Sequence, residues 1–204
     1  MEFYRRAAGS PARLGVFPGT FNPITVAHVA LARTALDTLH EVVFVLPRRF
    51  PHKDYRDTSL EQRVELLGTA LAAEPRFSIA AAEGGLFIEI ARECRAVYGD
   101  HVRLSFLCGR DAAERIANWD YGRPEAWQDM LREFELLVAP RGGEYCPDPA
   151  HSGAVRGMPL EPGCEGVSSS EVRRRIRTGE AWEHLVPTQI QDAVRKLYTG
   201  EAID

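Results

Sequence analysis

Two distant segments of the sequence combine small residues with side chains that can bind phosphate. The first runs from Gly19 to His28 and places glycine, threonine and a proline-containing turn ahead of a histidine. Glycine lets an anion approach the backbone, and the N–H groups at the start of a helix present positive partial charge. His28 falls in the first turn of the helix expected there, so it can contact the same anion. An ordinary strand-to-helix turn with a partly buried histidine explains this segment equally well.

The second segment runs from Gly166 to Arg173 and contains three consecutive serines, Ser168, Ser169 and Ser170. Serine hydroxyls and backbone donors at a helix start, followed by an arginine in the next turn, can bind several phosphate oxygens at once. A serine N-cap on an exposed helix is the simpler explanation of this segment alone. The cluster Arg173–Arg175 is likewise more typical of a solvated helix face than of a site.

The elements that would position these segments alternate along the chain. Short apolar and β-branched runs predict five strands, at 13–17, 41–46, 77–81, 102–107 and 135–139. Helical spacing predicts helices at 26–39, 59–73, 86–98, 168–177 and 188–198, with short helical stretches after Asp111 and after Pro124. Thr25 is the expected N-cap of the first helix, and Ser59 begins a capping box that closes on Gln62.

This alternation predicts an α/β fold, a doubly wound parallel sheet of about five strands with helices on both faces. Its ligand site should lie outside the C-terminal ends of the strands. At 204 residues the chain suits one domain. We expect a Rossmann-like core over 13–140, a Gly- and Pro-rich loop over 141–166, and a C-terminal helical pair over 167–198.

Composition limits the class of protein. No apolar run approaches the roughly 18 residues of a membrane span, and the N-terminus lacks the apolar stretch of a secretion signal, so we expect a soluble, cytoplasmic protein without membrane partners. A net charge of −4 argues against nucleic acid as a partner. Four scattered cysteines without a CxxC pair favour reduced thiols over a zinc site: Cys94, Cys108, Cys146 and Cys164.

Taken together, the two segments resemble a known family. The first resembles the nucleotidyltransferase signature Gly-(Thr/Ser)-Phe-(Asp/Asn)-Pro-Ile-(His/Thr)-x-x-His, and the second resembles the distal motif Ser-Ser-x-x-(Ile/Val)-Arg. Within that superfamily the chain is most similar to nicotinate and nicotinamide mononucleotide adenylyltransferases, from Leu14 to Tyr198. The similarity also includes Phe50–Lys53, Cys108–Asp111, Trp119 and His184–Pro187.

The resemblance implies transfer of AMP from ATP to nicotinamide or nicotinate mononucleotide, forming NAD or deamido-NAD and pyrophosphate. His28 would contact the α-phosphate with the assistance of Thr25, and Lys53 and Arg173 would hold the triphosphate. Mg²⁺ would be bound mainly by phosphates and water, because the sequence offers no protein cage for it. The other expected substrate-binding residues are Gly19, Thr20, Phe21, Asn22, Gly109, Asp111, Trp119, Arg141, Ser168, Ser169 and Ser170.

Several of these residues have ordinary structural alternatives. Asp111 could bind a ribose hydroxyl at the switch point of the sheet, or it could cap the helix that follows. Trp119 resembles the residue that stacks on the pyridine ring, although a lone tryptophan is more often part of a core. Lys53 and Arg141 would be surface charges without the family pattern.

The chain also departs from the family pattern. Thr25 replaces the first histidine of the bacterial His-x-Gly-His pattern, and Ala27 replaces its glycine. The stretch 84–89 stands where bacterial nicotinate enzymes carry Tyr-Thr-x-x-Thr near the pyridine pocket. The choice between acid and amide acceptor therefore stays open, as does homo-oligomer formation. The alternatives are a sister transferase acting on phosphopantetheine, FMN or a sugar phosphate, and a non-catalytic nucleotide-binding protein.

Overall fold

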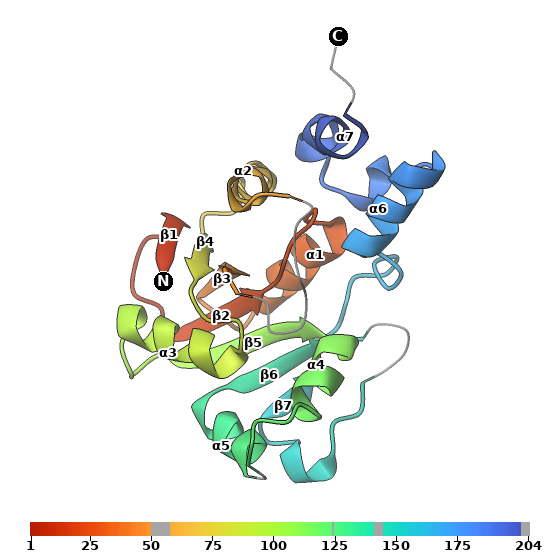
Figure 1. Cartoon of the computed structure of the whole chain (residues 1–204). Coiled ribbons are helices and arrows are strands. Elements are labelled where there is room, and N and C mark those ends of the chain that lie inside the picture. Colours follow the sequence, from red (N-terminus) through yellow and green to blue (C-terminus); the bar gives the residue numbers. More distant parts are fainter. Residues whose placement is uncertain (50–57, 124, 141–144, 201–204) are drawn as a thin grey trace.

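The computed structural model describes residues 1–49, 58–123, 125–140 and 145–200. A central sheet lies between two layers of helices (Figure 1). Its seven strands are β1 (Glu2–Arg5), β2 (Arg13–Pro18), β3 (Glu41–Pro47), β4 (Phe77–Ala82), β5 (Arg103–Gly109), β6 (Glu135–Ala139) and β7 (Val155–Gly157). The helices are α1 (Val26–Ala35), α2 (Leu60–Ala70), α3 (Phe87–Tyr98), α4 (Arg110–Ala117), α5 (Ala126–Glu133), α6 (Ser169–Thr178) and α7 (Gln191–Thr199).

The strands are ordered β1-β4-β3-β2-β5-β6-β7, and every pair except β1 with β4 is parallel. The five predicted strands and the doubly wound fold are confirmed. Two edge strands were not predicted. β1 is a short antiparallel addition, and β7 lies inside 141–166, where the sequence predicted only a loop. Three residues of β7 are too few to produce a period that can be recognised in the sequence.

Alternate residues of the central strands face two separate cores. On β3, Phe44 belongs to the core that includes residues of α1, α2, α6 and α7, whereas Val43 and Val45 belong to the core that includes residues of α3, α4 and α5. Both groups are fully buried, so β3 is covered on its two faces as its continuous apolar run predicted. The C-terminal helices are thereby tied to the face that carries α1 (Figure 1).

Helix starts follow the predicted caps more closely than helix ends follow the apolar pattern. Thr25 and Ser59 both form complete capping boxes, with His28 and Gln62 as the reciprocal partners. The first helix ends at Ala35, although the pattern predicted an end at Leu39. Leu39 is nevertheless buried, with only 4% of its surface exposed, because hydrogen-bonded turns follow the helix and keep this side chain in the core. Gly15 makes this possible, since a Cβ there would lie 2.9 Å from Leu39 Cδ1.

No helix among the described residues is long and apolar enough to cross a membrane.

Candidate active site

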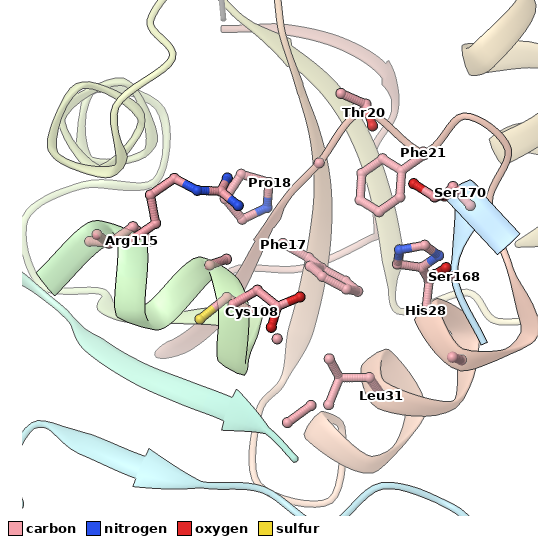
Figure 2. A pocket seen from close by; sticks show the side chains of 18 of the residues that line it. Phe17, Pro18, Thr20, Phe21, His28, Leu31, Cys108, Arg115, Ser168 and Ser170 are labelled. Atoms are coloured by element: carbon pink, nitrogen blue, oxygen red, sulfur yellow. The ribbon is translucent and has the colours of Figure 1, made fainter. Parts of the chain in front are cut away.

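A cavity of about 700 Å³ opens at the C-terminal ends of β2, β5 and β6. β2 and β5 are neighbours in the sheet, and the chain continues outward from them in opposite directions, so this is the switch point of the fold. Its walls include the segment after β2, the helix α4 after β5 and the start of α6 (Figure 2), together with the start of α3. The sequence predicted the site at this edge of the sheet.

His28 lies on the cavity wall in the first turn of α1. The Thr25 backbone N–H donates to His28 Nδ1 at 3.1 Å, and Thr25 Oγ1 lies 2.7 Å from the same nitrogen. A backbone N–H can only donate, so Nδ1 accepts and the proton of the neutral ring is on Nε2. The imidazole is therefore oriented to donate a hydrogen bond to an anion in the cavity.

Phe21 shapes the loop that leads to His28. Its φ of 46° lies in the left-handed region that side chains rarely adopt, and its ring is 2% exposed. The ring packs edge-on against His28, with centroids 5.3 Å apart. Gly19 is required beneath it, because a Cβ there would lie 2.9 Å from the ring. Buried Arg63 fixes the same loop by donating to the Thr20 carbonyl at 3.1 Å.

The second predicted segment docks directly on this loop. Ser169 Oγ donates to the Pro23 carbonyl at 2.7 Å, and the Arg173 guanidinium donates to the Asn22 carbonyl. The start of α6, including Ser168 and Ser170, forms the wall beside His28 (Figure 2). The structure thus brings together the two motifs that were predicted to bind phosphate, across more than 140 residues of sequence.

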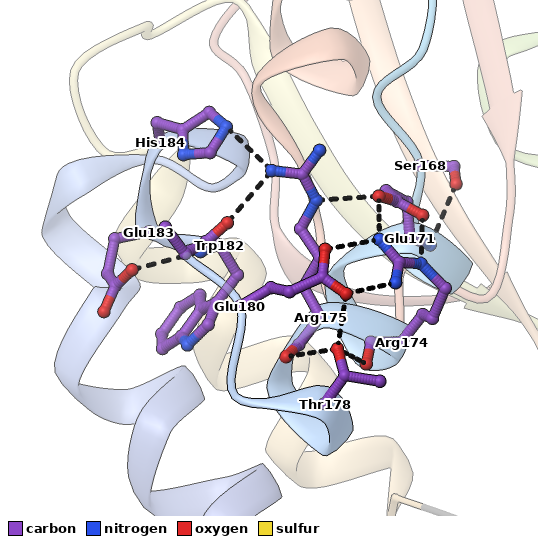
Figure 3. A network of polar contacts seen from close by, with 10 residues as sticks. Ser168, Glu171, Arg174, Arg175, Thr178, Glu180, Trp182, Glu183 and His184 are labelled. Atoms are coloured by element: carbon purple, nitrogen blue, oxygen red, sulfur yellow. Dashed lines mark hydrogen bonds and ion pairs between the residues drawn. The ribbon is translucent and has the colours of Figure 1, made fainter.

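The three adjacent arginines of α6 have different surroundings. Arg173 lines the cavity, whereas Arg174 and Arg175 both donate to Glu171, and Arg174 also pairs with Glu180 (Figure 3). These hydrogen bonds hold the pKa of the Glu171 carboxyl at about 2. Arg174 and Arg175 therefore belong to a solvated ion-pair network, whereas Arg173 belongs to the cavity wall.

Two predicted site residues lie behind the cavity wall. Thr25 and Asn22 are fully buried and are not among the residues that line the cavity. Thr25 is connected to the site by its contacts with His28 Nδ1. Asn22 Oδ1 accepts hydrogen bonds from the hydroxyls of Thr58 and Tyr198, so this side chain holds the loop in place.

The opposite wall contains Gly109, Asp111 and Trp119. Gly109 is the N-cap of α4 and Asp111 lies in its first turn, so Asp111 does not cap this helix. Trp119 is 38% exposed, and the alternative that it belongs to a core is wrong. The predicted residues Lys53 and Arg141 lie outside the described residues.

Residues outside the predicted set of site residues complete this wall, and three of them, Gly85, Leu86 and Phe87, belong to the stretch 84–89 that the resemblance placed near the pyridine pocket. They are mainly aromatic, apolar or backbone groups from α3, α4 and the segment after α4, with one added cation: Gly85, Leu86, Phe87, Arg115, Ile116 and Tyr121. Arg115 has no motif around it, and on an amphipathic helix it is indistinguishable from a surface charge. Cys108 also reaches the cavity, but burial raises the pKa of its thiol to about 12. A thiolate nucleophile is therefore not available there.

The charges of the cavity suit a polyanion. Its described lining carries the cationic groups Arg115 and Arg173 together with the imidazole of His28, against one carboxylate, Asp111. Among the described residues, no group of three or more His, Cys, Asp or Glu side chains could form a metal site. A divalent ion here would have to take most of its ligands from the substrate and from water.

Comparisons with known proteins agree with this geometry. The family model "Cytidylyltransferase-like" matches residues 16–175. A probable nicotinate-nucleotide adenylyltransferase of Moorella thermoacetica is 30% identical, with 91% of this chain and 90% of that protein covered. A protein of the same name from Thermus thermophilus is also 30% identical, with 90% of this chain and 97% of that protein covered.

A solved structure agrees at the level of the fold. The Plasmodium falciparum nicotinic acid mononucleotide adenylyltransferase complexed with NaAD superimposes with a TM-score of 0.71 at 18% identity, covering 93% of this chain and 98% of that one. Because the two bacterial relatives match along almost their whole length and the family model spans most of the sequence, this chain belongs to the nicotinate-nucleotide adenylyltransferase family.

Proposed function

We propose that this protein transfers the adenylyl group of ATP to nicotinate or nicotinamide mononucleotide, a step in NAD biosynthesis. The observation that carries the proposal is the convergence of two phosphate-binding segments, 19–28 and 168–173, on one wall of a single cavity. The names of the curated relatives support the same reaction. As the composition predicted, we place this reaction in the cytoplasm.

In this reaction a phosphate oxygen of the mononucleotide attacks the α-phosphorus of ATP. A new P–O bond forms, the bond to the bridging oxygen breaks, and its electron pair leaves with pyrophosphate. The attacking oxygen is already anionic, so no general base is needed. Catalysis depends on alignment of the two phosphates and on stabilising the charge that spreads over the α-phosphate oxygens.

The chain supplies donors for that charge. His28 lines the cavity wall, and its Nε2–H can donate to an α-phosphate oxygen while Thr25 maintains its tautomer. Arg173 and the hydroxyls of Ser168–Ser170 would bind the remaining phosphate oxygens from the start of α6. We propose the same role for Lys53 on the basis of family resemblance.

The donor set also fits Mg²⁺ bound together with ATP. A single carboxylate in the described lining, Asp111, cannot form a protein cage, so phosphate oxygens and water would supply most ligands. When bound, the ion would offset the negative charge of the phosphates and make the α-phosphorus more electrophilic. Asp111 would instead bind a ribose hydroxyl, the role proposed for it from the sequence.

The test is an acceptor screen with purified protein, ATP and Mg²⁺, with pyrophosphate release as the readout. Nicotinate and nicotinamide mononucleotides are compared with FMN, phosphopantetheine and a sugar phosphate at equal concentrations. We expect turnover with at least one pyridine mononucleotide and formation of the matching dinucleotide. Turnover with another phosphate alone would assign the chain to a sister transferase, and no turnover with any acceptor would favour a non-catalytic protein.

A further inference from the structure

Arg115 extends from α4 into the cavity, toward Pro18 and across from His28, Ser168 and Ser170 (Figure 2). Its side chain is exposed to solvent, and among the described residues it forms no hydrogen bond or ion pair. Arg110, five residues earlier on α4, instead pairs with Glu114 at 2.7 Å and does not line the cavity. Arg115 is therefore a cation available to a ligand.

The wall around Arg115 suits a flat ring. Phe87, Ile116, Trp119 and Tyr121 line this part of the cavity, whereas the phosphate-binding segments form the other side. Aromatic and apolar walls bind planar ligands through their faces and edges. The reaction brings two rings into the cavity, adenine and pyridine. Of these, only the ring of nicotinate carries a negative charge that a guanidinium can complement.

The start of α3 cannot supply this charge recognition in its present state. Gly85 and Leu86 line the same end of the cavity, but their backbone N–H groups both donate to Glu89 Oε2, at 2.9 and 3.0 Å. The chain's own carboxylate therefore already occupies the donors that could otherwise bind an anionic ring substituent. Of the side chains that line this end in the described part of the chain, Arg115 carries the one positive charge.

We propose that Arg115 selects the acid form of the acceptor by pairing with the ring carboxylate of nicotinate mononucleotide. A guanidinium binds a carboxylate through two parallel charge-assisted hydrogen bonds, which a neutral carboxamide cannot reproduce. This inference rests on the proposed adenylyl transfer and deepens it by naming the acceptor and the residue that distinguishes it from its amide.

The experiment measures kcat/KM for nicotinate and nicotinamide mononucleotides in wild type, Arg115→Gln and Arg115→Lys. Wild type is expected to prefer the acid. Arg115→Gln should lower the acid-to-amide ratio by roughly 10- to 100-fold, the range of a lost charged hydrogen bond. The value of kcat/KM for nicotinate mononucleotide should fall, while that for nicotinamide mononucleotide should stay near wild type. Arg115→Lys keeps the charge without the planar fork and should give an intermediate ratio.

Arg110→Gln is the matched control, because it removes a neighbouring arginine of α4 whose partner is Glu114 and not a ligand. The acid-to-amide ratio of Arg110→Gln should equal that of wild type. An unchanged ratio in Arg115→Gln, an equal loss on both acceptors, or a wild type that prefers the amide overturns the assignment of Arg115. Absence of turnover with either acceptor in wild type overturns the adenylyl-transfer proposal together with this assignment, so the two failures are distinguishable.

Discussion

At the residue scale, the proposed chemistry depends on a single proton on the His28 ring. Two groups of the same N-cap, the Thr25 backbone N–H and its hydroxyl, contact Nδ1 from outside the cavity. The helix cap that starts α1 thus also determines which ring nitrogen carries the proton. This links a local folding signal directly to the donor that the proposed reaction needs.

We expect His28→Ala to lower turnover by roughly 100-fold or more, by analogy with the loss of other transition-state donors. The fold should remain, because His28 is only half-buried. The measurement is kcat from pyrophosphate release, with circular dichroism to verify folding. His40→Ala is the matched control, since His40 Nδ1 also accepts a backbone N–H, from Ala12, but lies away from the cavity. Unchanged turnover in His28→Ala would remove this residue from the mechanism.

We propose that Thr25 is a positioning residue, because it contacts His28 and does not line the cavity itself. Thr25→Val keeps the shape but removes the oxygen that lies 2.7 Å from His28 Nδ1, so the ring loses one restraint on its orientation. We expect kcat to fall about tenfold, the equivalent of one hydrogen bond, with KM for ATP little changed. Thr25→Ser should restore most of kcat. If Thr25→Val raised KM and left kcat intact, the hydroxyl would be a binding group and not a positioning one.

At the element scale, predictions succeeded where the determinants are local. Thr25 and Ser59 could be identified as caps because a capping box depends on residues three positions apart. The two segments predicted to bind phosphate are also local patterns, and the structure brings them together on one wall of the cavity. Arg115 could not be singled out from a local pattern, since its place in the cavity depends on what α4 faces after folding. The edge strand β1 was missed because four residues paired with a distant strand leave little local pattern.

The ion-pair network of α6 gives a prediction at this scale (Figure 3). Hydrogen bonds from Arg174 and Arg175 lower the pKa of Glu171 from 4.5 to about 2. A depressed carboxyl pKa contributes stability above its unfolded value, and that contribution is lost as pH falls toward the folded value. We therefore expect Glu171→Gln to lower the melting temperature at pH 7, with the difference from wild type shrinking between about pH 4.5 and pH 2.

Thermal unfolding followed by circular dichroism across that pH range measures the effect. Glu114→Gln is the comparison variant, because Glu114 forms a single exposed pair with Arg110 and so shows what an ordinary surface pair contributes. A melting difference for Glu171→Gln that is equally large at neutral and acid pH would contradict the ionic origin of the effect.

At the scale of the whole molecule, the site exists only when the C-terminal helices dock on the loop after β2. Three hydrogen bonds between described residues contribute to this junction: Ser169 to the Pro23 carbonyl, Arg173 to the Asn22 carbonyl, and the Tyr198 hydroxyl to Asn22 Oδ1. The apolar core on the α1 face includes Val172 of α6 and Val194 of α7, both fully buried. We propose on this basis that residues 1–204 fold and act as one domain.

Tyr198→Phe tests that junction without removing any apolar surface. It deletes one of two hydroxyl donors to a fully buried amide oxygen, while Thr58 Oγ1 still donates at 3.0 Å. We expect a loss of about 1 kcal/mol in the free energy of unfolding, which corresponds to roughly 2–4 °C in melting temperature for a chain of this size.

Tyr4→Phe is the control, because Tyr4 is 41% exposed. If the chain is one domain, both variants should unfold in a single transition, and only Tyr198→Phe should have a lower melting temperature than wild type. A separate early transition in Tyr198→Phe would mean that the C-terminal helices unfold independently, and a shift no larger than in Tyr4→Phe would show that this bond does not hold the junction.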